Sequence, residues 1–262
     1  ALPFFPNTSR YSDAELRDKL AESEQARDKL QGDVAQAKAK AKDAKAQSDK
    51  LQAELQRVRV QDMDIVVVID VTGSMSDVIE QISNQTAGLI DVVERMAPSL
   101  GIGIVAYGDR QYQNVLTTHA ISDVANQTQR AALDHFLKAT LTAAVGKGSG
   151  AHSGEIAEEI HLAIEHAVGM NWRSQAQERH IIIFTDAPAR PGMEQRAYNA
   201  AQAFAAKPDH TVSTVQYDGK EWAKAEVLLK QLATVGNGEY IDGRGGKSFL
   251  AAVLLAIMKD AY

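Results

Sequence analysis

A continuous apolar run near residue 65 constrains the fold of this chain more than any other feature. Residues 65–69 read Ile-Val-Val-Val-Ile and are followed by Asp70. Residues 181–184 read Ile-Ile-Ile-Phe and are followed by Thr185 and Asp186. Apolar runs without polar alternation are typical of strands buried on both faces, as in a parallel sheet with helices on each side. The sequence therefore predicts an α/β sheet in which two strands end at a carboxylate.

Strands and helices alternate from residue 63 onward. We expect strands at 63–70, 100–107, 114–120, 180–186, 211–217 and 239–242. We expect helices at 76–96, 126–141, 154–168, 193–206, 221–234 and 247–260. The segment 114–120 follows the second strand after a short polar turn, so we expect it to pair antiparallel at an edge. Gly236-Asn237-Gly238 predicts the end of a helix just before the last strand.

Residues 12–60 form a region of different character, with no Pro, one Gly and many Ala, Lys, Glu, Asp and Gln. Ser12 and Glu15 fit a capping box at the start of a helix. From Leu16 to Val58, steps of four and three residues mark a heptad seam that predicts a coiled coil roughly 65 Å long. We expect this helix to form a homo-oligomer or a stalk. A solvated single helix remains an alternative, and the seam leaves strand number and orientation open.

Bulk properties exclude several classes of protein. The net charge is -6 without a clustered basic face, so we expect no nucleic-acid partner. The absence of Cys excludes disulfides, thiolate metal sites and cysteine nucleophiles. No apolar run reaches the roughly 18 residues of a membrane span. Residues 1–11 predict an extended N-terminal segment, and their start without Met favours a periplasmic, secreted or surface-anchored protein over a cytoplasmic one.

Oxygen-bearing side chains follow the two apolar runs. Asp70, Thr72 and Ser74 stand at a spacing of two, with Gly73 relaxing the turn between the hydroxyls, and Asp186 follows the later run. Because the carboxyl ends of parallel strands meet at one edge of the sheet, we expect these four side chains to converge. Carboxylates and hydroxyls are ligands for a hard divalent cation such as Mg²⁺.

These residues resemble the signatures of the von Willebrand factor A (VWA) domain and its metal-ion-dependent adhesion site (MIDAS). The resemblance covers residues 62–262 and rests on Asp-Val-Thr-Gly-Ser at 70–74, Phe-Thr-Asp-Ala-Pro at 184–188 and a glycine-bearing last strand at 233–240. It implies a doubly wound, mostly parallel six-stranded sheet of order 3-2-1-4-5-6, with helices on both faces and Mg²⁺ or Mn²⁺ at its carboxyl edge.

The resemblance also implies a function and the role of each ligand. Thr72 and Ser74 would bind the cation directly, and Asp70 and Asp186 directly or through water. Such a set is rich in neutral ligands, so the cation keeps charge to bind an Asp or Glu carboxylate of a partner protein. The chain would then be a non-enzymatic, metal-dependent adhesion or assembly module displayed on a coiled-coil stalk.

A third element of the family precedes the helix that follows the third strand. Related sequences often carry Gly-Gly-Asp-x-Pro-Glu there, whereas residues 148–155 read Gly-Ser-Gly-Ala-His-Ser-Gly-Glu. Counting back from Glu155 puts His152 in the place of the Asp, with Ser153 beside it. A His would favour Mn²⁺, Ni²⁺ or Zn²⁺, and a Ser would keep Mg²⁺. We expect Ser153, His152 or neither to complete the site.

Other functions are less well supported by the sequence. A haloacid dehalogenase phosphatase needs a second Asp two residues after the first, where this chain has Thr72. A complete P-loop and a Gly-x-Ser-x-Gly elbow are both absent. We therefore expect no enzyme, with a metal-dependent hydrolase as a minor alternative. The incomplete third element favours another alternative, a structural component of an envelope or secretion assembly with a vestigial metal site.

Overall fold

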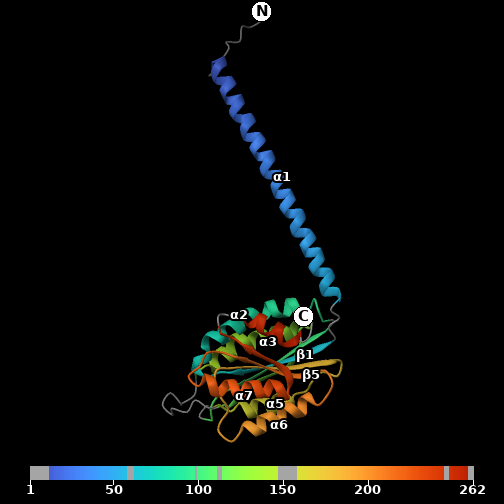
Figure 1. Ribbon diagram of the computed structural model, residues 1–262, viewed down its shortest axis with the longest axis vertical. Coiled ribbons are helices and arrows are strands. Elements are labelled where there is room, and N and C mark those ends of the chain that lie inside the picture. Colours follow the sequence, from blue (N-terminus) through green and yellow to red (C-terminus); the bar gives the residue numbers. More distant parts are fainter. Residues whose placement is uncertain are drawn as a thin grey trace, which may run out of the picture. The chain divides into compact units, whose positions relative to one another are not determined.

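The computed structural model describes residues 12–57, 62–97, 99–110, 114–146, 158–244 and 248–258, and the side chains of these residues except 13, 43–44 and 46–57. The chain divides into two units, Ala1–Arg57 and Val58–Tyr262. Figure 1 labels several elements of the two units. Of the helices in the described ranges, none combines the length and apolar character that crossing a membrane requires.

The first unit is built on one long helix, α1 (Asp13–Arg57). It begins at the predicted capping box, since the Ser12 amide donates to Glu15 Oε2 at 2.6 Å and the Glu15 amide donates to Ser12 Oγ at 3.4 Å. Every described side chain of α1 is exposed, including the apolar seam residues Leu16, Leu20 and Leu30. The long helix is therefore confirmed, and its pairing with a second helix stays a prediction.

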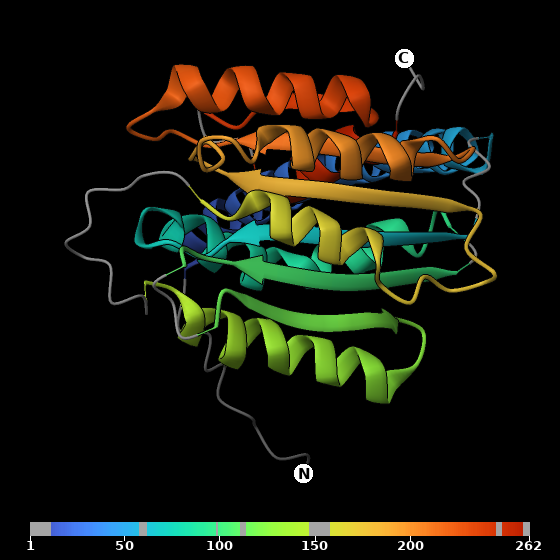
Figure 2. The same cartoon turned by 90° about the horizontal axis from the view of Figure 1, so that it is seen from below.

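The second unit contains a six-stranded sheet in the order β3-β2-β1-β4-β5-β6 (Figure 2). The strands are β1 (Met63–Asp70), β2 (Leu100–Tyr107), β3 (Leu116–Asp123), β4 (Glu178–Thr185), β5 (His210–Gln216) and β6 (Asn237–Asp242). All pairings are parallel except that of β3 with β2. The predicted strand order and the antiparallel edge strand are confirmed.

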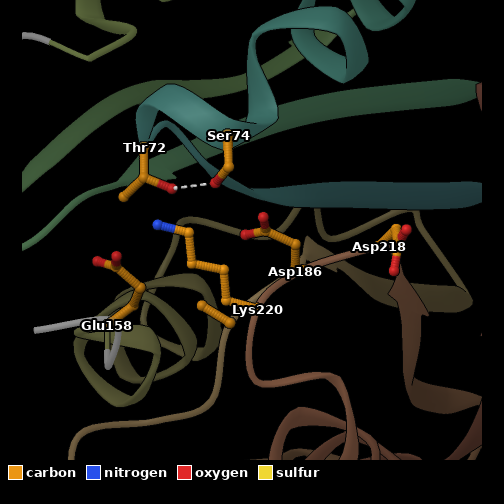
Figure 3. Close-up of a pocket in the computed structure, with 8 residues that line it drawn as sticks. Thr72, Ser74, Glu158, Asp186, Asp218 and Lys220 are labelled. Atoms are coloured by element: carbon orange, nitrogen blue, oxygen red, sulfur yellow. Dashed lines mark hydrogen bonds between the residues drawn. The ribbon is translucent and has the colours of Figure 1, made fainter.

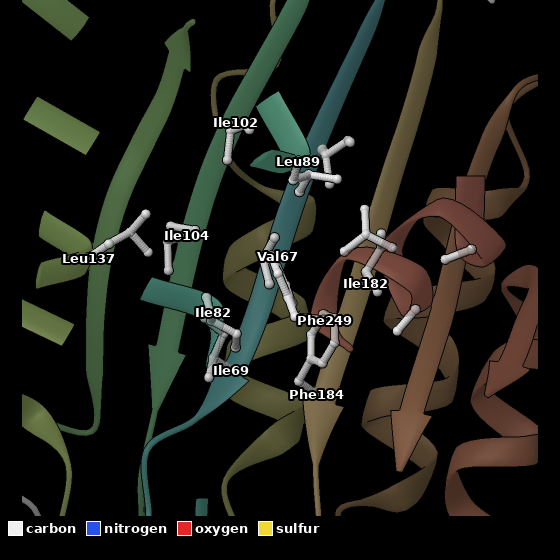
Figure 4. Packing of buried hydrophobic residues seen from close by; sticks show 14 of the residues in the cluster. Val67, Ile69, Ile82, Leu89, Ile102, Ile104, Leu137, Ile182, Phe184 and Phe249 are labelled. Carbon is white, nitrogen blue, oxygen red and sulfur yellow. The ribbon is translucent and has the colours of Figure 1, made fainter. Parts of the chain in front are cut away.

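Helices cover both faces of the sheet. They are α2 (Ser76–Val93), α3 (Gln127–His135), α4 (Thr142–Ala144), α5 (Ile160–Val168), α6 (Glu194–Ala205), α7 (Trp222–Val235) and α8 (Phe249–Ile257). Alternate residues of β1 enter different cores. Val67 packs with residues of α2, α3 and α8 (Figure 4). Val66 packs with residues of α5, α6 and α7. Burial on both faces explains the unbroken apolar run of β1.

Several predicted elements differ from the structure at their ends, and α2, for example, ends at Val93 instead of residue 96. β3 ends three residues later than predicted, because its register against β2 pairs Leu116 with Tyr107 and Asp123 with Gly101. The helix predicted at 126–141 becomes a π-helix over Phe136–Leu141, where the wider turn buries three apolar side chains. The helix predicted from residue 154 begins at Ile160, and its first predicted residues lie outside the described ranges up to residue 157.

Candidate metal centre

The turn after β1 brings two hydroxyls together. Asp70 is fully buried at the strand end, and its Oδ1 accepts hydrogen bonds from the Thr72 amide at 2.9 Å and the Thr72 hydroxyl at 2.7 Å. A short 3-10 turn, Gly73–Met75, then leads into α2. The Thr72 and Ser74 hydroxyl oxygens lie 3.4 Å apart (Figure 3). The predicted convergence of alternate side chains after β1 therefore occurs in the structure.

The end of β4 contributes the second part of the centre. The Thr185 hydroxyl donates to Asp70 Oδ2 at 2.9 Å and accepts from the Ala187 amide at 3.1 Å. The next residue, Asp186, is 4% exposed. Its Oδ1 is buried and has no hydrogen-bond partner among the described residues. A buried carboxylate oxygen without a partner is costly, so a bound group that contacts it would be stabilising.

Thr72, Ser74 and Asp186 line one cavity of about 570 Å³, together with Glu158, Ala187 and the loop 218–220 between β5 and α7. This loop approaches Asp186 closely, since a Cβ at Gly219 would overlap the Asp186 carbonyl oxygen. Lys220 reaches into the cavity from the same loop, and its amino end points toward Thr72 (Figure 3). Asp70 is hydrogen-bonded to Thr72 at the edge of this cavity.

Four of the six predicted site residues are thus brought together. They are Asp70, Thr72, Ser74 and Asp186. The other two, His152 and Ser153, lie outside the described residues. The choice between them therefore stays open.

Burial and mutual repulsion raise the pKa values of the acids around the cavity. The pKa of Asp70 rises to about 7, mainly because of burial and then because of the charge of Asp186. Burial also raises the pKa of Asp186, against a hydrogen bond from Ser74 that lowers it. The pKa of Glu158 rises to about 9 through burial and the charges of Asp70, Asp109 and Asp186. This arrangement favours either bound protons or a bound cation.

Sequence reasoning missed three polar residues that line the cavity, Glu158, Asp218 and Lys220. Glu158 is the one of these that is buried. It is 5% exposed, and its Oε2 is buried without a hydrogen-bond partner in the described part of the chain. The count back from Glu155 follows the family motif and therefore reaches His152 and Ser153 but not Glu158. The adjacent acids Glu158 and Glu159 are visible in the sequence before the apolar residues of α5, but nothing local shows that one of them lines the cavity.

The donor set fits a hard cation such as Mg²⁺ or Mn²⁺. Its polar atoms are carboxylate and hydroxyl oxygens, and two of the carboxylates, those of Asp186 and Glu158, each have an unpartnered buried oxygen. No three His, Asp or Glu side chains of the described residues lie close enough to hold a metal ion by themselves. The hydroxyls of Thr72 and Ser74 are therefore needed to complete any such site.

Two other side chains that could be mistaken for functional groups have structural roles. Trp172 packs against one core of the sheet, with its ring 5.0 Å from that of Phe204. Asp109 is engaged in an ion pair with Arg190 at 3.2 Å.

Comparison with known proteins shows the fold alone. No family model and no curated protein matches the chain. Among solved structures, the pilus adhesin SpaC from Lactobacillus rhamnosus GG in its open conformation has 13% identity and a TM-score of 0.52 over 75% of this chain. A second structure of that adhesin has 12% identity, a TM-score of 0.51 and the same coverage of this chain. BatB from Bacteroides thetaiotaomicron has 16% identity and a TM-score of 0.48, covering 73% of this chain and 97% of BatB.

The matched region spans only 29% and 30% of the length of the two adhesin chains. The similarity is therefore to one part of a much larger protein, and it is a similarity of architecture. Together with the sheet order β3-β2-β1-β4-β5-β6, it shows that the second unit has a doubly wound, mostly parallel α/β fold like that of part of this adhesin.

Proposed function

We propose that this chain is a non-enzymatic protein-binding module that uses a divalent cation to bind an Asp or Glu carboxylate of a partner protein. One observation carries the proposal: the buried, unpartnered Oδ1 of Asp186 belongs to a cavity that the hydroxyls of Thr72 and Ser74 also line. The fold shared with part of a pilus adhesin is consistent with this role.

Each residue of the centre has a distinct part in this proposal. Thr72 and Ser74 would bind Mg²⁺ or Mn²⁺ directly through their hydroxyls. Asp70 would orient Thr72, to which it is already hydrogen-bonded, and Asp186 would contribute its unpartnered oxygen. His152 or Ser153 would add a further ligand. The cation, when bound, supplies the positive charge that attracts the partner's carboxylate.

The seam of α1 supports a second part of the proposal, a homo-oligomer formed through residues 12–60. Four large apolar side chains of this helix, Leu16, Leu20, Leu30 and Val34, are 45% to 63% exposed. Burying them against a second copy would remove apolar surface from water. Several copies on one stalk would raise avidity for a multivalent partner, as expected of a periplasmic, secreted or surface-anchored module.

Cation titration tests the central claim. Isothermal calorimetry with Mg²⁺ and Mn²⁺ should show one site in the wild type, and Thr72→Ala should weaken it at least about tenfold. Ser76→Ala is the matched control, because Ser76 is an exposed hydroxyl one turn further along the chain. Acidic peptides on a solid support should retain the protein with Mg²⁺ and release it in EDTA. A wild type that binds no divalent cation would contradict the proposal.

A vestigial centre in a structural assembly component is the second candidate. The raised pKa values of Asp70 and Glu158 favour it, because protonated acids allow the chain to fold without a cation. In that case the wild type would bind its partner equally well with Mg²⁺ and with EDTA. A phosphatase assay on the purified protein checks the remaining hydrolase alternative.

A further inference from the structure

We propose that Glu158 adds a carboxylate ligand to this centre, in the place where the sequence resemblance predicts His152 or Ser153. The inference rests on the proposed cation site and adds a ligand to it. Glu158 lines the same cavity as Thr72, Ser74 and Asp186, and its Oε2 has no hydrogen-bond partner among the described residues. Figure 3 shows its carboxylate at the side of the cavity near Thr72.

The backbone of Glu158 is attached to the loop that carries Asp186. The Glu158 amide donates to the Pro188 carbonyl at 3.0 Å, and the Arg190 amide donates to the Glu158 carbonyl at 3.0 Å. These bonds form an isolated parallel bridge between Glu158 and Ala189. These bonds hold the backbone of Glu158 beside the segment that follows Asp186.

The arginines near this edge contact other acids. Arg190 donates to Glu159 Oε1 at 2.6 Å and to Asp109 at 3.2 Å, and Arg110 donates to Glu159 at 2.5 Å. Glu159 is fully buried, and its Oε1 accepts from both arginines. Burial raises the pKa of Glu158 most, followed by the charges of Asp70, Asp109 and Asp186, against the charge of Arg190 that lowers it. A cation in the cavity would offset the carboxylates of Glu158 and Asp186, which both line it.

Lys220 offers a competing source of positive charge. Its amino end points into the cavity, and it belongs to an exposed loop. If Lys220 were the permanent counter-ion of Glu158, the Glu158 carboxylate would not be a ligand, and its loss would leave the affinity for the cation unchanged. Lys220 is therefore included in the test.

A carboxylate ligand from Glu158 also has a consequence for the hydration of the ion. Mg²⁺ retains several waters beside its protein ligands, and carboxylate and water ligands also suit Mn²⁺. If Glu158 is a ligand, its loss should weaken Mn²⁺ binding and leave one more water on the ion. Water on bound Mn²⁺ is measured by proton relaxation, independently of any partner.

The experiment compares Glu158→Gln with Glu165→Gln in the full chain. Glu165 is a matched control because it belongs to α5 but pairs with Arg196 at the surface, at 2.7 Å. We expect Glu158→Gln to weaken Mn²⁺ binding at least about tenfold and to raise the number of bound waters, while Glu165→Gln leaves both unchanged. Lys220→Met should tighten Mn²⁺ binding or leave it unchanged, since it removes a positive charge from the cavity.

The outcomes separate this inference from the proposed function. If the wild type binds no Mn²⁺, the proposed function fails. If the wild type and Glu158→Gln bind Mn²⁺ equally, with equal hydration, the cation site stands and the role of Glu158 is overturned. Thermal unfolding in EDTA checks the fold of each variant. Should Glu158→Gln unfold, Glu158→Asp replaces it, because this variant keeps the charge but withdraws the carboxylate, and it should also weaken Mn²⁺ binding.

Discussion

The hydroxyl of Thr185 donates a hydrogen bond to Asp70 Oδ2 at 2.9 Å, which joins the ends of β4 and β1 across 115 residues of sequence. Because Asp70 orients Thr72 through its other oxygen, this bond links the two halves of the candidate centre. Thr185→Val keeps the shape but removes the donor. We expect a loss of about 1–3 kcal/mol in the free energy of unfolding, since a buried carboxylate oxygen loses its partner.

The same variant should bind Mg²⁺ about tenfold more weakly, because Asp70 is then free to rotate away from Thr72. Urea unfolding and calorimetric titration measure the two effects. Thr118→Val is the control, because it makes the same substitution at an exposed position of the edge strand β3. Equal metal affinity in both variants would show that the bond from Thr185 has no part in cation binding.

Asp70 predicts a pH dependence of the metal-free protein. Its pKa is about 7 in the folded chain against an ordinary value of 3.8, so the folded state holds the proton more tightly than the unfolded state. The proton on Asp70 therefore stabilises the folded state fully below the pKa of 3.8 in the unfolded chain, and this stabilisation is lost as pH rises through about 7. In EDTA, wild-type stability should therefore fall relative to Asp70→Asn between pH 4 and pH 8.

Saturating Mg²⁺ should reverse this trend, because the cation replaces the proton and binds better as Asp70 ionises. Urea unfolding at a series of pH values, with Mg²⁺ or EDTA, measures both curves. A difference between wild type and Asp70→Asn that stays constant with pH would contradict the raised pKa.

The opposite end of β1 contains a buried ion pair that should affect stability without affecting the metal. Asp64 is fully buried and accepts from the Arg173 side chain at 2.5 Å and from the Arg173 amide at 2.8 Å. Gly101 on β2 makes room for this pair, since a Cβ there would overlap Asp64. Arg173→Met leaves a buried carboxylate unpaired, which costs about 3–5 kcal/mol.

Arg196→Met breaks the exposed pair with Glu165 and should cost no more than about 1 kcal/mol. Denaturant unfolding measures the free energy of unfolding of the two variants. Where Arg173→Met remains folded, its Mg²⁺ affinity should equal that of the wild type, because Asp64 and Asp70 lie at opposite ends of the strand. A similar cost for both arginines would refute the assignment of Asp64 as a buried charge that depends on Arg173.

The sheet could be predicted because its strands are recognisable from short stretches of sequence. Burial on both faces requires unbroken apolar runs, and those of β1 and β4 are visible directly in the sequence. Asp70, Thr72 and Ser74 follow one run at close spacing, so their convergence needed no knowledge of distant contacts. The edge strand β3 was placed less well, because its ends depend on the register with β2 rather than on its own pattern.

Glu158 could not be predicted because its position depends on a contact between distant segments. The residues before α5 have helix-favouring composition, which led to a predicted helix start at residue 154. In the structure, Glu158 is instead held in a bridge with Ala189, and the helix begins at Ile160. No local pattern encodes that bridge. The π-helix at Phe136–Leu141 is similarly determined by packing against the core.

The exposed seam of α1 leaves the number and orientation of paired helices open, and the arrangement that we propose to test is a parallel, in-register dimer. In that arrangement the charged residues flanking the seam would meet across the interface as follows: Lys19 with Glu24, Asp33 with Lys38, and Lys40 with Lys45. Two of these three pairs are opposite in sign, which favours this register over one that brings like charges together. Arg27 lies on the seam itself, but its charge is offset by Asp28 at 2.9 Å.

A single introduced thiol tests this arrangement, because the chain contains no Cys of its own. Ser23 lies on the seam, so Ser23→Cys should form a disulfide between two copies under mild oxidation if the helices are parallel and in register. An antiparallel pair would place the two thiols far apart.

Leu30→Glu should convert the wild-type dimer to a monomer in sedimentation equilibrium, because it places like charges in the apolar seam. Gln25→Glu, on the opposite face of the helix, should leave the dimer intact. A monomeric wild type, or a dimer that Ser23→Cys fails to cross-link, would rule out parallel pairing through α1.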